Sequence, residues 1–506
     1  MADSAETEEA KTGFKFLKDT LFSTVAPVVG KIKGLVLIPV IAKILGATDY
    51  GLWHQFTITV GLLTTVATLR LGAAINRFLS PIEDLEELGQ EFSSIVVFVT
   101  ALSVVVSGIG ALFPGRVAIW LFGDASWWMV VWLLAVYVPL SSVSNRYLNM
   151  LRSRRRHDAN AAYTLVKEFV LGVGLVGLVV WTESIVLLLS YLVAVQVAAL
   201  AFLVFFIHHR MQIPVRWPRF ERLSKYIRFS FPLLIAGAGH WTAQMADRYV
   251  LVQHTDLGAV GAYSVPYALA GVGLFAVKPL LQVILPDFSV LYERGLQDKI
   301  ERRFNTILKY FVASQCLVIA GAVALNRDLI LLFSSEEFLA GVPVLSIVPL
   351  GFLFYGVLQF TTQLVTVGKQ TVRLGFLWAG IAGLNVVLNL WLIPIWGLIG
   401  AAAATVAAYC VGAVICVRLA RRKFSITLAP GTVVRVLLFG GIACFLMIAL
   451  PRVGWGGRIV DVAMRMAVGI LIYCSGLMLT GFVSQRERRL FSKFIPERLQ
   501  WLLRFT

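Results

Sequence analysis

Residues 184–208 read SIVLLLSYLVAVQVAALAFLVFFIH, a stretch that contains no Asp, Glu, Lys or Arg. A helix needs roughly 20 predominantly apolar residues to cross the hydrocarbon core of a bilayer, so this segment alone is long enough to span a membrane. The whole chain of 506 residues is 58% hydrophobic and only 14% charged. Its mean hydropathy is +0.81. Because soluble proteins are nearer one quarter charged, the composition predicts an all-α polytopic membrane protein.

Fourteen segments of the chain meet this criterion of length and apolarity. They lie near residues 15–43, 51–79, 91–113, 127–151, 160–181, 184–208, 226–253, 258–285, 304–325, 340–366, 373–395, 397–419, 432–451 and 459–483. In order, they predict two six-helix lobes followed by two C-terminal helices. The predicted parts are a tail (1–14), an N-lobe (15–209), a linker (210–225), a C-lobe (226–420), spans thirteen and fourteen (432–483) and a basic amphipathic tail (484–506). Residues 289–303 and the last tail mix apolar and charged positions at helical spacing, which indicates helices lying on an anionic leaflet.

Positive charges are unevenly distributed between the two sets of loops. Basic clusters such as 152–156 fall on one side, whereas only Arg116, Arg327, Arg452 and Arg458 fall on the other. Since Lys and Arg are retained in cytoplasmic loops, the pattern predicts that both termini are cytoplasmic. The acidic start MADSAETEEA lacks the basic region and cleavage site of a signal peptide. The net charge of +17 is interpreted as topogenic, and no nucleic-acid partner is expected.

Residue types that carry catalysis or bind metals form no pattern in the sequence. The cysteines, Cys316, Cys410, Cys416, Cys444 and Cys474, lie in apolar segments without metal-ligand spacing. The six His are scattered, and there is no Gly-rich phosphate loop. We therefore expect no catalytic residue, no metal and no cofactor. A membrane glycosyltransferase or ligase is the alternative from another functional class, and it would need a sizeable polar loop that the sequence lacks.

A weak internal repeat links the two predicted lobes. Tyr50-Gly51-Leu52-Trp53 follows the first span, and Val260-Gly261-Ala262-Tyr263 follows the seventh. Each turn opens a new helix with a glycine and an aromatic residue. Two repeated halves with a substrate site between them are a common transporter plan, and this pair of turns is consistent with it.

Three stretches resemble a known family. Residues 384–412 read LNVVLNLWLIPIWGLIGAAAATVAAYCVG, with paired Asn, an Ile-Pro near the end of one span, and Gly-x-x-Gly-Ala-Ala at the start of the next. ILGATDYGLW (44–53), followed by LGAAINRFLS (71–80), and LGAVGAYSVPYAL (257–269) are similar to the opening and midpoint of the same family. The chain is identified as a member of the polysaccharide-transporter branch, the O-antigen-flippase type, of the multidrug/oligosaccharidyl-lipid/polysaccharide exporter superfamily.

The resemblance implies two six-helix lobes in a V, a central cavity and rocker-type alternating access. It also implies a substrate, an undecaprenyl-pyrophosphate-linked oligosaccharide, and a place in the bacterial cytoplasmic membrane in cell-surface or exopolysaccharide synthesis. The partners expected are the lipid-linked oligosaccharide, membrane lipids, a polysaccharide polymerase and glycosyltransferases. Two alternatives of the same superfamily remain, a multidrug or cation antiporter and a lipid II flippase.

Physical roles are predicted for individual residues of the motif at 384–412. Pro394 is expected to end a helix, and Gly397 and Gly400 to permit tight re-entry of the next one. Asn385 and Asn389, four residues apart, share one helical face and can form hydrogen bonds with a neighbouring helix.

Ionisable side chains inside the spans point to a binding site. Each costs roughly 2.5–3.5 kcal/mol or more in hydrocarbon, so such residues normally face a cavity or a partner. The candidates for substrate binding are Lys31, Lys33, Arg70, Lys278 and Arg248. Their positive charge suits the phosphate or carboxylate groups of an anionic substrate. Arg146, beside Asn145 near the end of its span, is explained equally well as a topogenic residue.

Two polar stripes are candidates for ion coupling or for a cavity wall. His240, Gln244 and Asp247 align at i, i+4 and i+7, and Gln359 and Gln363 lie in a second stripe. Hydrogen bonding between helices within a lobe would explain both stripes equally well. Because adjacent residues do not face each other on a helix, Asp247 and Arg248 are expected to find partners elsewhere.

Overall fold

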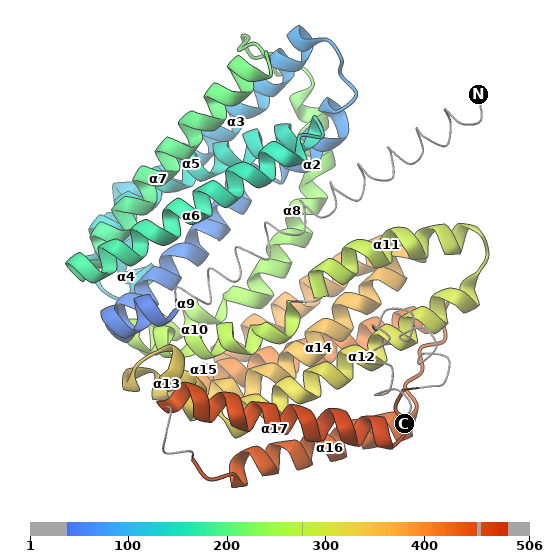
Figure 1. Ribbon diagram of the computed structural model, residues 1–506. Coiled ribbons are helices and arrows are strands. Elements are labelled where there is room, and N and C mark those ends of the chain that lie inside the picture. Colours follow the sequence, from blue (N-terminus) through green and yellow to red (C-terminus); the bar gives the residue numbers. More distant parts are fainter. Residues whose placement is uncertain (1–37, 276, 453–456, 484–506) are drawn as a thin grey trace. The chain divides into compact units, whose positions relative to one another are not determined.

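The computed structural model describes residues 38–275, 277–452 and 457–483, which form helices and their connecting loops (Figure 1). Within these residues, ten helices are long and apolar enough to cross a membrane, or eleven if one bent pair counts as a single span. The all-α polytopic class is thereby confirmed. The number fourteen and the position of both termini stay predictions, because residues 1–37 and 484–506 lie outside the described part.

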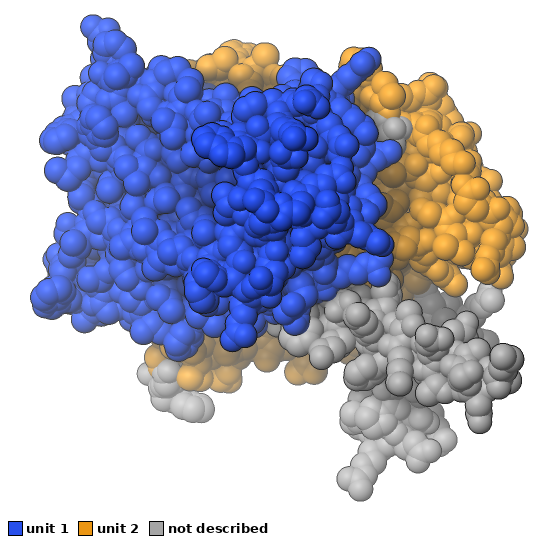
Figure 2. Space-filling model, turned by 90° about the horizontal axis from the view of Figure 1, so that it is seen from above, with its two compact units in different colours: residues 1–264 blue, residues 265–506 orange. Residues whose placement is uncertain are grey.

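The chain divides into two compact units, residues 1–264 and 265–506, which Figure 2 shows in different colours. Unit 1 begins with the helix Ile38–Thr68. It continues with α2 (Leu71–Ala74), η1 (Ile75–Leu79), α3 (Leu85–Leu112), α4 (Pro114–Phe122), η2 (Ala125–Trp127), α5 (Trp128–Ser153), α6 (His157–Thr182), α7 (Ile185–Phe205), η3 (Phe206–Arg210), α8 (Leu223–Met245) and α9 (Asp247–His254). The helix α10 (Leu257–Ala270) begins in unit 1.

The core of unit 1 forms where α3 packs against α5. The helix α3 begins at a capping residue, because the Asp84 carboxylate accepts hydrogen bonds from the amides of Glu86 and Glu87 at 3.1 and 3.3 Å. Further along, Phe92 of α3 meets Tyr147 of α5 edge to face, with ring centroids 5.1 Å apart. This apolar contact fixes α5, which carries the candidate site described below.

The predicted linker 210–225 lies along the acidic first turns of α3. Ser94 accepts a hydrogen bond from the amide of Arg219 at 2.8 Å and donates one to its carbonyl at 2.9 Å. Ion pairs join Arg216 to Glu86 and Arg222 to Glu87. The side chain of Trp217 remains exposed.

Gly51 and Gly261 mark the place where two helix backbones come closest to each other among the described residues of unit 1. A Cβ atom on Gly51 would lie 1.9 Å from the carbonyl oxygen of Leu257, and one on Gly261 would lie 2.0 Å from that of Ala47. Each glycine therefore faces the carbonyl oxygen of the residue that lies four positions before the other glycine. The two stretches that the sequence pairs as a repeat, predicted as turns, lie within the helix Ile38–Thr68 and within α10, and they are in direct contact at a distance that only glycine permits.

We expect Gly51→Ala to destabilise the protein by about 1–3 kcal/mol, because the added methyl group forces the helices apart. Gly108→Ala is the matched control, since Gly108 of α3 has no heavy atom within 4 Å of its Cβ position. Alanine is the better helix former there, so that variant is expected to be neutral or slightly stabilising. Thermal unfolding in detergent measures both, and equal melting temperatures would contradict the prediction.

Unit 2 contains the remaining helices. They are η4 (Gly271–Leu274), α11 (Val277–Glu293), α12 (Gln297–Ala324), α13 (Asn326–Phe333), η5 (Glu336–Gly341), α14 (Val342–Val367), α15 (Thr371–Ala420), α16 (Pro430–Ala449) and α17 (Gly457–Leu479). Residues 289–303, predicted as one interfacial helix, are instead the end of α11 and the start of α12. Gly295, with a φ of 70°, makes the turn between them.

The helix α15 contains the motif on which the family resemblance rests. Its backbone leaves helical geometry at Gly397 (φ 52°, ψ −125°), between the two predicted spans. The predicted end at Pro394 is therefore too early, since the helix continues through the proline to the glycine. A Cβ on Gly400 would lie 2.3 Å from the carbonyl oxygen of Leu392, which confirms the tight re-entry. Asn389 donates a hydrogen bond of 2.9 Å to Asn385 within the same helix.

A buried ion network joins α17 to α13. The guanidinium of Arg465 contacts Asp328 at 3.0 Å and Asp461 at 3.3 Å, and all three side chains are less than 10% exposed. Arg465 also donates a 2.8 Å hydrogen bond to the carbonyl oxygen of Met447 in α16. Arg452, which is largely exposed, adds a contact of 3.1 Å to Asp328. The last two helices are thus held to the rest of unit 2 by charge as well as by apolar packing.

Candidate functional site

The first element of the candidate site is a break in the helix that carries Arg70. The helix Ile38–Thr68 and the segment Leu71–Leu79 meet at an angle of 53°. At the break, Leu69 and Arg70 have φ values of 44° and 57°. Two successive non-glycine residues in the left-handed region are unfavourable, and such conformations persist where surrounding structure imposes them, often at functional sites.

The guanidinium of Arg70 lies against the backbone of α8. A Cβ atom on Gly237 would be 2.4 Å from Nη2 of Arg70, so the glycine leaves the space that the guanidinium occupies. Arg70 is itself exposed. The bend therefore places a cation at the surface of unit 1, held between α2 and α8.

The second element is Arg146 of α5, which is only 5% exposed. Its Nε and Nη1 atoms are buried and have no hydrogen-bond partner among the described residues. Arg70 and Arg152 are close enough to act on its charge electrostatically. A buried guanidinium that has neither a carboxylate nor its full set of hydrogen bonds is costly, and a bound anion would relieve that cost.

Arg152, at the end of α5, completes a group that we call the arginine cluster (Arg70, Arg146 and Arg152). Arg152 donates a 3.4 Å hydrogen bond to Asn149. The amide of Asn149 lies against Gly72 of α2, where a Cβ would be 2.4 Å from its Nδ2. None of the three arginines forms an ion pair with a carboxylate in the described ranges of the chain. Three guanidinium groups without a carboxylate partner among the described residues make this part of unit 1 a candidate site for anions.

Arg248, another predicted binding residue, has a different environment. Its Nη1 lies 2.6 Å from Oδ1 of Asp247, and the two side chains are 1% and 3% exposed. The two neighbours pair with each other, contrary to the prediction that both partners lie elsewhere, although the backbone at Ala246 between α8 and α9 stays in the right-handed helical region (φ −66°, ψ −26°). Tyr263 donates a 2.6 Å hydrogen bond to the other oxygen of Asp247. The charge of Arg248 is therefore compensated within unit 1.

The remaining predicted residues do not gather in one place. Lys31 and Lys33 lie outside the described residues. Lys278 of α11 is exposed in unit 2. His240 and Gln244 form a hydrogen bond of 3.2 Å along α8. In α14, Gln359 donates to the hydroxyl of Tyr355 at 2.7 Å, and Gln363 donates to the carbonyl of Gln359 at 3.3 Å.

Arg146 and Arg152 were not among the residues predicted to bind substrate. A basic residue near the end of a span is usually topogenic, and only the tertiary structure shows that Arg146 is buried beside Arg70. The available signal was the combination of Asn145, Arg146 and Asn149 in an otherwise apolar helix. In the part of the chain that the structure describes, no group of three or more His, Cys, Asp or Glu side chains is arranged to hold a metal ion.

Comparisons with known proteins agree with the fold. The probable low-salt glycan biosynthesis flippase Agl15 of Haloferax volcanii is 21% identical over 386 residues, which cover 74% of this chain and 77% of that protein. The probable flippase AglR of the same organism is 23% identical over 207 residues, 40% of each chain. The match therefore spans less than half the length of AglR.

Solved structures share the architecture at low sequence identity. An inward closed structure of the lipid II flippase MurJ aligns with a TM-score of 0.72 at 16% identity, covering 91% of this chain and 98% of that one. An inward-facing multidrug resistance MATE transporter of the MOP superfamily aligns with a TM-score of 0.58 at 14% identity, covering 80% of this chain and 94% of that one. These likenesses show a common fold.

A family model described as polysaccharide biosynthesis protein matches residues 16–291. The match includes the stretches at 44–53, 71–80 and 257–269 that carry part of the resemblance seen in the sequence, and that resemblance is confirmed. Since the matched segment extends over more than half of the 506 residues, the chain belongs to the polysaccharide biosynthesis protein family.

Proposed function

We propose that this protein is a flippase that carries an anionic lipid-linked oligosaccharide of the undecaprenyl-pyrophosphate type across the bacterial cytoplasmic membrane. The substrate crosses by alternating access and is not chemically changed, and both termini of the carrier are cytoplasmic. Family membership and the flippases among its relatives support the transport role. A polysaccharide polymerase and glycosyltransferases are the partners that such a pathway needs.

The burial of Arg146 without a carboxylate is the observation that carries the proposed substrate. A pyrophosphate offers several acceptor oxygens, and guanidinium groups bind such oxygens in bidentate fashion. Arg70 at the helix break and Arg152 at the end of α5 bring two further guanidinium groups into electrostatic range of Arg146. An anionic head group in this position would replace the counter-ions that the described residues do not supply.

Removing Arg70 tests the proposal. We expect Arg70→Ala to slow translocation of a fluorescent lipid-linked oligosaccharide in proteoliposomes by about tenfold, since a hydrogen bond to a charged group contributes about 1.5–3 kcal/mol. Lys278→Ala is the parallel variant in unit 2. Arg116→Ala, an exposed arginine outside the cluster, removes the same charge and is expected to transport at the rate of the unmodified protein. Full transport by both test variants, with normal insertion, would eliminate the charged-site hypothesis.

The two alternatives within the superfamily predict different results. A cation antiporter needs an acidic group that can hold a cation, and both oxygens of Asp247 already have partners in Arg248 and Tyr263. Loss of drug resistance in Asp247→Asn would nevertheless favour the antiporter. Rescue of a strain depleted of its lipid II flippase would favour the lipid II role over the polysaccharide role.

A further inference from the structure

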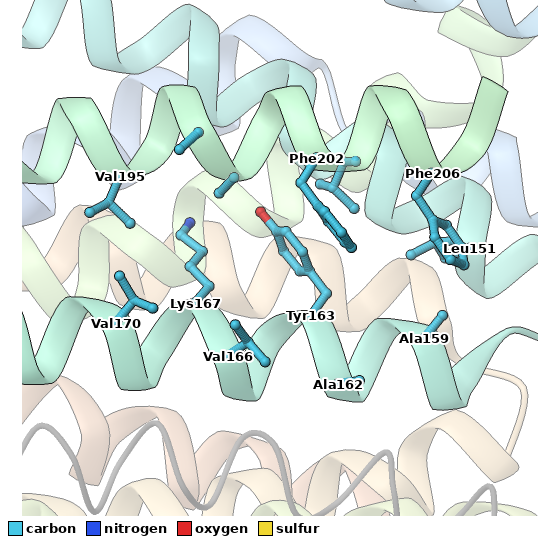
Figure 3. A pocket seen from close by; sticks show the side chains of 13 residues that line it. Leu151, Ala159, Ala162, Tyr163, Val166, Lys167, Val170, Val195, Phe202 and Phe206 are labelled. Atoms are coloured by element: carbon cyan, nitrogen blue, oxygen red, sulfur yellow. The ribbon is translucent and has the colours of Figure 1, made fainter. Parts of the chain in front are cut away.

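An apolar groove lies between α6 and α7 (Figure 3). Its volume is about 390 Å³, within the range of roughly 300–1,000 Å³ typical of ligand pockets. Its walls come from α6 and α7 with contributions from the ends of α5 and η3.

Small residues create the groove. Ala159 and Ala162 on α6 and Ala198 and Ala199 on α7 line the groove, and their small side chains leave space between the two helices. At the far end the helices close again, because the hydroxyl of Tyr191 donates a 2.7 Å hydrogen bond to the carbonyl of Val170. The groove is thus a local opening in a helix pair that is otherwise in contact.

A row of rings leads from the groove to the basic loop at residues 154–156. Tyr163 stacks on Phe202 with centroids 6.4 Å apart, and Phe202 stacks on Phe206 at 6.2 Å. The guanidinium of Arg156 lies 5.9 Å from the centre of the Phe206 ring. Arg155 and Arg156 are both exposed. The groove therefore has an apolar body and a mouth that carries Arg155 and Arg156, of which Arg156 also lies 3.4 Å from the carboxylate of Asp158.

The hydroxyl of Tyr163 is the feature that points to a ligand. The residue is only 8% exposed, and its oxygen is buried without a hydrogen-bond partner among the described residues. Figure 3 shows the side chain directed from α6 toward α7, into the groove. A buried hydroxyl without a partner is unfavourable, and an oxygen acceptor supplied from the bilayer would satisfy it.

The depth of Tyr163 fits the ester groups of a phospholipid. Six residues separate it from His157 at the start of α6, a rise of about 9 Å. The polar layer on each side of a bilayer is about 5–8 Å thick. If the basic loop lies at the level of the phosphates, Tyr163 lies just below that layer, where the ester carbonyls meet the acyl chains.

We propose that this groove is a binding site for an anionic phospholipid of the leaflet at the basic end of unit 1. The phosphate contacts Arg155 and Arg156, an ester carbonyl accepts a hydrogen bond from Tyr163, and an acyl chain lies along Phe202 and Val166. Lys167, bonded to Gln196 at 2.5 Å, adds positive charge to the wall. The charge of the mouth favours an anionic over a zwitterionic head group.

The test compares lipids that differ only in the head group. Native mass spectrometry of the purified protein measures binding of phosphatidylglycerol and of phosphatidylcholine with identical chains, and thermal unfolding measures stabilisation. We expect several-fold preference for phosphatidylglycerol. Tyr163→Phe is expected to weaken that binding about five- to tenfold while leaving the lipid-free protein at least as stable, because the variant removes only a hydroxyl without a partner.

Three further variants separate the parts of the site. Arg155→Gln with Arg156→Gln should abolish the head-group preference, and Ala162→Phe should block both lipids by filling the groove. Val173→Phe, on an exposed part of α6 outside the groove lining, should bind as the unmodified protein does.

Equal binding of both lipids with no effect of Tyr163→Phe would overturn the proposal. So would preferential binding of polyprenyl phosphate, because the groove would then hold the carrier lipid. All these readouts are independent of transport, so the proposed function can fail without this site failing.

Discussion

Replacing Arg146 by glutamine is expected to slow glycolipid translocation about 30-fold or more. Truncating one member of a buried charged contact costs roughly 2 kcal/mol at the least, which corresponds to that factor. The charge of Arg146 is buried and has no carboxylate partner in the described ranges, so a bound pyrophosphate would lose its most desolvated contact. Initial rates in proteoliposomes with a labelled lipid-linked oligosaccharide measure the loss.

The same substitution is expected to leave the protein at least as stable in the absence of substrate. Glutamine removes a buried charge whose cost is not offset by a carboxylate, so the melting temperature in detergent should stay constant or rise. Arg116→Gln controls for the change in net charge. A lower melting temperature together with lost transport would show that Arg146 serves the fold instead, and full transport would remove it from the site.

Replacing Arg465 by methionine is expected to destabilise the protein by about 3–5 kcal/mol. Asp328 and Asp461 would both remain buried, and the bond to the carbonyl of Met447 would be lost. Arg452→Gln is the comparison, because the side chain of Arg452 is 71% exposed and an exposed pair contributes about 0–1 kcal/mol. Unfolding in detergent measures the difference.

A triple variant checks the cause of this effect. Asp328→Asn and Asp461→Asn combined with Arg465→Met removes the buried carboxylates as well as the guanidinium. If charge imbalance is responsible, the triple variant should recover much of the stability that the single variant loses. A triple variant no more stable than Arg465→Met would show that hydrogen bonding and packing, not charge, hold α17 in place.

Local composition was sufficient to predict the helices, because the span of a bilayer imposes a length and an apolarity that the sequence displays directly. Arg70 could be proposed as a candidate from the sequence, since it lies far from any polar flank, and its role in binding stays a prediction. Arg146 could not be assigned to the site, because its burial beside Arg70 depends on how α5 packs against the broken helix. The pairing of Asp247 with Arg248 was also missed, because adjacent residues on a helix are not expected to face each other.

Contacts between distant segments were the least predictable. Asp328 and Arg465 are 137 residues apart, so the sequence does not indicate their ion pair, although Asp461 lies four residues before Arg465 on the same helix. The groove between α6 and α7 was equally hidden, because four alanines in apolar helices are ordinary until the structure shows that they line one groove.

The reciprocal crossing at Gly51 and Gly261 has a consequence for how its residues can vary. Each glycine contacts the backbone of the opposite helix, so the contact is reciprocal. The same reciprocity is found where two identical subunits meet across a two-fold axis. A larger side chain at one glycine therefore cannot be accommodated by a smaller side chain on the opposite helix, because it would collide with main-chain atoms. The two positions tolerate change only if the helices separate, so we expect variation at either site to be restricted independently of the other.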